Sequence, residues 1–64
     1  MAISIKAARV NKGLTQTELG DRVGKNKNTI ASYESYTTTP DIKTAQEIAK
    51  VLGMSLDEII WSVE

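Results

Sequence analysis

Polar side chains able to hydrogen-bond with nucleic-acid bases lie close together between residues 15 and 34. Lys27, Asn28 and Ser32 have the spacing expected of the outward face of one short helix. Lysine can donate to the O6 and N7 atoms of guanine, asparagine can form two hydrogen bonds with adenine, and serine can contact either base. The alternative is that these side chains are ordinary solvated groups on a surface helix, and residue type alone leaves it open.

Two short helices joined by a tight turn are predicted to position these side chains. Thr15 and Glu18 have the spacing of a capping box, which begins a helix. Gly24 fits the end of that helix and the turn after it, and Asn26 is a favourable N-cap for the next helix. Such an arrangement, over about residues 15–34, places side chains in the major groove of DNA.

Three further helices are expected around this unit, at about residues 4–12, 41–52 and 55–61. Residues 35–40 have no helical pattern and end at a proline, so a loop is predicted there. No segment shows a convincing strand pattern, and the predicted fold class is all-α, a compact five-helix bundle. The predicted core consists of Ile5, Ala8, Leu14, Leu19, Val23, Ile30, Tyr33, Ile42, Ala45, Ile48, Ala49, Leu52, Met54, Leu56 and Ile59.

The length of 64 residues predicts one domain, residues 1–64. The chain has no cysteine and no histidine, which excludes disulfides and Cys/His zinc sites, and no metal or other cofactor is expected. An enzyme is poorly supported, because no Gly-rich phosphate loop or catalytic carboxylate pair is recognisable, and no small-molecule ligand is evident. The apolar runs are too short for a membrane span or a signal peptide, so a cytoplasmic protein is expected.

The charge is divided unevenly although its sum is zero. Residues 1–32 carry six basic and two acidic side chains, a net charge of +4, and residues 33–64 carry two basic and six acidic side chains, a net charge of −4. This asymmetry predicts a basic face for an anionic partner, although chance can produce it in so short a chain.

In the order of its motifs the chain resembles the Cro/C1-type (XRE-like) helix-turn-helix DNA-binding domain of phage repressors and bacterial regulators. The matching segments are RVNKGLTQTELGDRVG, then NTIASYE, then the proline, then TAQEIAKVLGMSLDEII, together spanning about residues 5–60. The resemblance implies a lambda-repressor-like domain and a sequence-specific transcriptional regulator of double-stranded DNA, such as a Cro-like phage repressor. The alternative is an antitoxin-like or other protein-interaction module that keeps this fold.

The resemblance also implies roles for individual residues. Lys27, Asn28 and Ser32 match the base-contacting positions, and Arg9 and Glu34 match a structural ion pair between the first and third helices. The expected phosphate contacts are Gln16, Thr15, Thr29, Thr37 and Thr38.

The loop after the third helix departs from the family pattern. Tyr36 stands where a glycine is usual, and a bulky residue adopts the left-handed conformation of such a position only at a cost. Residues 37–39 are threonines in place of basic residues. We therefore expect weaker binding and a shallower salt dependence than for a strongly basic repressor.

A homodimer on a palindromic operator is expected, because one such domain contacts only a few base pairs and half-sites lie about one turn (~34 Å) apart. The candidate dimer contacts are Ile60, Trp61 and Val63. Trp61 could equally cover the core of its own chain.

Overall fold

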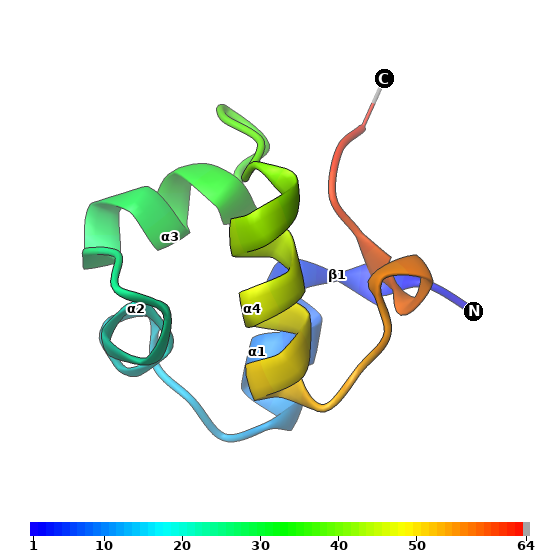
Figure 1. Ribbon diagram of the computed structural model, residues 1–64, viewed down its shortest axis with the longest axis horizontal. Coiled ribbons are helices and arrows are strands. Elements are labelled where there is room, and N and C mark those ends of the chain that lie inside the picture. The colour runs from blue at the N-terminus through cyan, green and yellow to red at the C-terminus, as the bar shows by residue number, and fades with distance from the viewer. Residues whose placement is uncertain (64) are drawn as a thin grey trace.

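A computed structural model describes residues 1–63, which fold into a mostly helical unit (Figure 1). This part of the chain contains four α-helices, one short 3-10 turn and two strands of two residues each. In chain order the elements are β1 (Ile3–Ser4), α1 (Ile5–Asn11), α2 (Gln16–Val23), α3 (Lys27–Glu34), α4 (Ile42–Leu52), η1 (Leu56–Glu58) and β2 (Ile59–Ile60).

Each α-helix begins at a side chain that accepts a hydrogen bond from the first turn. The N-cap residues are Ser4, Thr15, Asn26 and Asp41. An N-cap acceptor satisfies a backbone donor that would otherwise have no intrahelical partner. The caps predicted at Thr15, as a capping box with Glu18, and at Asn26 are both confirmed.

The prediction of a fifth helix over residues 55–61 is wrong. The capping box of Ser55 and Glu58 forms, but only the single turn η1 follows it, and Ile59 is already extended (φ −118°, ψ 136°). Strand β2 then pairs in parallel with β1, with Ile3 opposite Ile59. Branched side chains favour extended backbone, and the pairing satisfies backbone groups of both terminal segments. The prediction from the sequence that the chain forms no strand is therefore wrong as well.

The core lies where the four helices meet. Its fully buried large side chains are Ile5, Leu19, Ile30 and Ile48, one from each helix. The prediction that Ile42 belongs to the core is wrong, because this residue is 67% exposed in the first turn of α4. Residues Thr44 and Ala45 are the ones that turn inward at this end of α4.

Helices α2 and α3 lie on one side of the molecule, and β1 lies on the other, together with the N-terminus and the segment after η1 (Figure 1). Helix α2 packs against both α3 and α4, so the pair α2–α3 rests on the rest of the core. Within residues 1–63 no helix is long and apolar enough to cross a membrane.

Candidate nucleic-acid interface

The turn between α2 and α3 is closed by two glycines. Gly24 ends α2 in the left-handed conformation (φ 72°, ψ 30°), and the Lys25 amide donates to the carbonyl of Gly20 at 2.9 Å. A Cβ on Gly20 would lie 2.4 Å from the Lys25 carbonyl oxygen. The turn can therefore fold against α2 only because residue 20 has no side chain. Sequence reasoning missed Gly20, although an isolated glycine inside a helical pattern is a signal of close packing.

Helix α3 presents the candidate base-contacting residues at and after its start. Lys27 and Asn28, in the first turn, are both exposed, whereas Ser32, one turn later, is half-buried. The other face of α3 is fixed by Ile30, which is fully buried, and Tyr33, which is buried. The orientation of the helix is thus set by its core contacts, and Lys27 and Asn28 remain free to reach a ligand.

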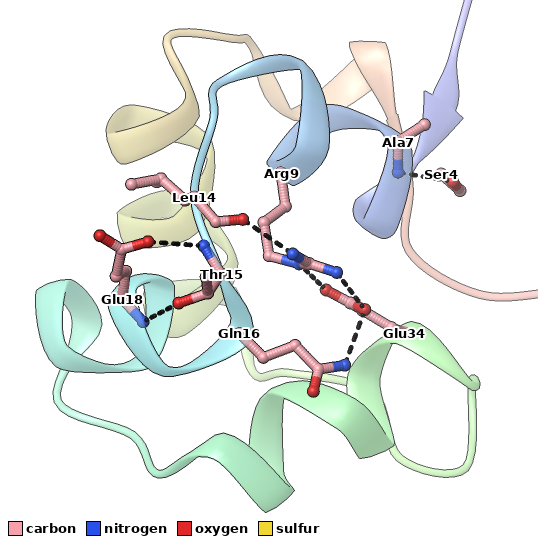
Figure 2. Close-up of polar contacts among 8 residues, drawn as sticks. All are labelled: Ser4, Ala7, Arg9, Leu14, Thr15, Gln16, Glu18 and Glu34. Carbon is pink, nitrogen blue, oxygen red and sulfur yellow. Dashed lines mark hydrogen bonds and ion pairs between the residues drawn. The ribbon is translucent and has the colours of Figure 1, made fainter.

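A buried hydrogen-bond network joins α1, the start of α2 and the end of α3 (Figure 2). Arg9 donates to Glu34 through Nε (2.5 Å, to Oε2) and Nη2 (3.2 Å, to Oε1). Its Nη1 atom donates to the Leu14 carbonyl at 2.7 Å. The side chains of Arg9 and Glu34 are 10% and 6% exposed, so the structure places this pair out of water.

Gln16 is the third side chain of this network. Its Nε2 atom donates to Glu34 Oε1 at 3.0 Å, a contact that the sequence did not reveal. A glutamine amide has a second N–H and a carbonyl oxygen. Glu34 therefore fixes the side chain of Gln16 at the first residue of α2 while a donor stays available for a phosphate.

The hydroxyl groups of Thr15 and Thr29 both take part in hydrogen bonds at helix N-termini. A threonine hydroxyl has one proton. In Thr15 the hydroxyl oxygen accepts from the Glu18 amide at 3.1 Å, and a hydrogen bond of the Thr15 side chain also helps to lower the pKa of the Glu18 carboxyl. In Thr29 the hydroxyl donates that proton to Asn26 Oδ1 at 3.0 Å, beside the cap bond from its own amide at 2.8 Å.

Thr37 and Thr38 lie in the loop after α3 and differ in whether the hydroxyl proton is used within the protein. The Ser35 hydroxyl donates to the Ser32 carbonyl at 3.2 Å, so its 2.9 Å contact with Thr37 requires Thr37 to be the donor. The side chain of Thr38 is exposed to solvent. Among the four candidate threonines, Thr38 thus keeps a hydroxyl donor for a phosphate.

Two carboxylates at helix N-termini are held in the ionised form. Hydrogen bonds from the side chain and backbone of Thr44 lower the pKa of Asp41, and the charges of Lys25 and Lys43 add to this effect. The pKa of Glu18 is lowered chiefly by its hydrogen bond with the backbone of Thr15. In the described part of the chain no three acidic side chains converge as metal ligands would.

Two basic side chains of the first half of the chain, Lys12 and Arg22, lie at a surface hollow that no residue of α3 lines. The hollow is also lined by Lys50, Glu47 and Val51. Lys12 is the C-cap of α1, and Arg22 and Lys50 lie in the last turns of α2 and α4, where a cation offsets the helix dipole.

The candidate dimer contacts near the C-terminus differ in exposure. Trp61 is half-buried against the core, and its Nε1 atom donates to the Leu56 carbonyl at 2.9 Å. Ile60 is half-buried, whereas Val63 is 63% exposed. These contacts favour the interpretation that Trp61 covers the core of its own chain.

Comparison with known proteins agrees with this geometry. A family model described as helix-turn-helix matches residues 5–59, which include all four α-helices. The chain belongs to the helix-turn-helix family. This confirms the resemblance of this helix-turn-helix protein that was drawn from the sequence.

Several relatives of this helix-turn-helix chain are named as transcriptional regulators. It is 34% identical over 60 residues to the transcriptional repressor RstR of the cryptic phage CTXphi from Vibrio cholerae, covering 94% of this chain and 54% of RstR. It is 30% identical over 64 residues to the uncharacterised regulator YgzD of Bacillus subtilis, and 36% identical over 64 residues to one from Methanothermobacter thermautotrophicus. Both alignments cover 100% of this chain, and they cover 97% and 93% of the two relatives. It thus spans about half of RstR and nearly all of the other two.

Proposed function

We propose that this helix-turn-helix protein is a sequence-specific regulator of transcription that binds double-stranded DNA and acts as a repressor. Lys27 and Asn28 contact base edges from the first turn of α3, with Ser32 one turn further along the major groove. The observation that carries the proposal is the exposure of Lys27 and Asn28 directly after the Asn26 cap, on a helix whose other face is buried. Base contacts of this motif come from the N-terminal part of the second helix. The name of the relative RstR supports repression.

The phosphate contacts that support this arrangement are Gln16, which keeps a second N–H, and the exposed residues Thr15 and Thr38. Thr29 and Thr37 instead stabilise the cap of α3 and the loop after it. Hydroxyl and amide donors position a protein on the DNA backbone without adding charge. Because Lys25 and Lys27 are the cations in the turn and at the start of α3, we expect a shallow dependence of affinity on salt.

Residues 1–64 act as one cytoplasmic DNA-binding domain, which binds a palindromic operator as a homodimer without a cofactor or a catalytic step. One domain covers a few base pairs, so two copies on half-sites about 34 Å apart supply the specificity. Val63 is the exposed apolar side chain of the three candidates, and Ile60 and Trp61 are half-buried.

Fluorescence anisotropy with a pool of labelled duplexes, including the DNA upstream of the protein's own gene, tests the proposal. The wild-type protein should prefer one duplex, and Asn28→Ala should reduce that preference by about 5- to 150-fold. Gln46→Ala, an exposed residue of α4, is the matched control and should bind as the wild type does. Equal or absent binding on every duplex would reject the proposal and favour the protein-interaction module.

A further inference from the structure

Tyr36 has an unusual backbone conformation just after the end of α3. It is the one non-glycine residue with a positive φ (62°) among residues 1–63. A bulky side chain destabilises this conformation, which glycine adopts at no steric cost. A side chain that is nevertheless present at such a position is expected to supply contacts that glycine could not make.

The side chain of Tyr36 connects the loop to the opposite end of the chain. Its ring packs against the hydrophobic core, and its hydroxyl donates to the carbonyl of Ile60 at 3.3 Å. Ile60 lies in β2, opposite Ser4 of β1. The backbone amide of Tyr36 also donates to the carbonyl of Tyr33, so the residue is held at both its backbone and its side chain.

The loop after α3 carries three threonines in a row, at residues 37–39. The amides of Thr37 and Thr38 both donate to the carbonyl of Ser32, at 3.0 and 3.4 Å, while their side chains are exposed. We propose that Tyr36 is a positioning residue that anchors this loop to β2 and so presents Thr38 to a DNA phosphate. The proposal rests on the DNA-binding function proposed above and identifies how that interface is held.

Two substitutions separate the hydroxyl from the rest of the side chain. Tyr36→Phe removes only the hydrogen bond to Ile60, and Tyr36→Gly removes the ring as well as the strained conformation. With every variant fully folded, we expect the amides of Thr37 and Thr38 to exchange with solvent about two- to tenfold faster in Tyr36→Phe. Affinity should fall by about the same factor on preferred and unrelated duplexes alike, because phosphate contacts carry no sequence information.

Tyr36→Gly should exchange the loop amides faster, and lose more DNA affinity, than Tyr36→Phe does, although it relieves the backbone strain at residue 36. Val51→Ala is the control, because Val51 is a half-buried residue of α4 that lines the hollow away from α3. It should lower global stability without changing exchange in the loop, since such amides exchange by local opening.

Unchanged exchange in Tyr36→Phe would overturn the inference, as would faster exchange with unchanged affinity for a duplex that the wild type binds. Equal effects of Val51→Ala and Tyr36→Phe on the loop would overturn it too. If the wild type binds no duplex, the proposed function fails and the inference about phosphate positioning falls with it. Unaltered affinity of both Tyr36 variants on a duplex bound by the wild type would overturn this inference alone.

Discussion

Removing the carboxylate of Glu34 should destabilise the protein strongly. The side chains of Arg9 and Glu34 are 10% and 6% exposed and share two hydrogen bonds. In Glu34→Ala the guanidinium of Arg9 stays buried, and the Leu14 carbonyl is the acceptor that it keeps from this network. Breaking a buried ion pair from one side costs about 3–5 kcal/mol. Since a chain of this length has a free energy of unfolding of roughly 3–10 kcal/mol, this substitution removes a large part of it.

A double-mutant cycle identifies the reason for that loss. Arg9→Met and Glu34→Leu should each be strongly destabilising alone, whereas the double variant should lose less than either, because neither charge is left buried without a partner. Urea unfolding followed by circular dichroism gives the four free energies. Glu47→Ala, an exposed carboxylate of α4, is the control and should stay within about 0.5 kcal/mol of the wild type. Additive losses, or a loss below about 1 kcal/mol for either single variant, would refute the reasoning.

Three further predictions concern acid, the turn and the dimer. Hydrogen bonds lower the pKa values of Glu18 and Asp41 from 4.5 and 3.8, so their stabilisation is complete above those values and is lost as the pH falls through the lower folded-state values. Glu18→Gln and Asp41→Asn should each flatten this acid-side decline in urea melts, and an unchanged decline would contradict the assignment. Gly20→Val should cost about 1–3 kcal/mol in thermal melts, because its Cβ meets the backbone of Lys25; a neutral result would show that the turn can move away. Val63→Glu should leave the fold intact and prevent two copies from binding one operator in gel-shift assays, whereas an undiminished two-copy complex would exclude this residue from the interface.

The parts of the fold that could be predicted from the sequence depend on short-range interactions. The caps at Thr15 and Asn26 act on amides three residues away, so their side-chain types were enough to locate α2 and α3. The strand β2 could not be predicted in this way, because Ile59 is extended by pairing with Ile3 at the other end of the chain. A capping box at Ser55 marked a helix start correctly and said nothing of where that helix would end.

In the candidate site, too, the features that could be predicted from the sequence are those that depend on neighbouring residues. The exposure of Lys27 and Asn28 follows from their place directly after a cap, which the sequence displays. The hydrogen bond from Gln16 to Glu34 joins residues 18 positions apart. The hydrogen bond that the Thr29 hydroxyl donates to Asn26 depends on a side-chain rotamer. Neither has a sequence pattern, so the structure alone separates the donors that remain available from those already used.

The base contact of Asn28 is the central claim of this account, and substituted operators test it most directly. Each adenine of the preferred duplex is replaced in turn by 7-deazaadenine, which lacks the N7 acceptor that asparagine uses. The account predicts one position per half-site where the wild type loses affinity and Asn28→Ala loses none, a coupling of about 1–3 kcal/mol. Equal losses for both proteins at every position would contradict it.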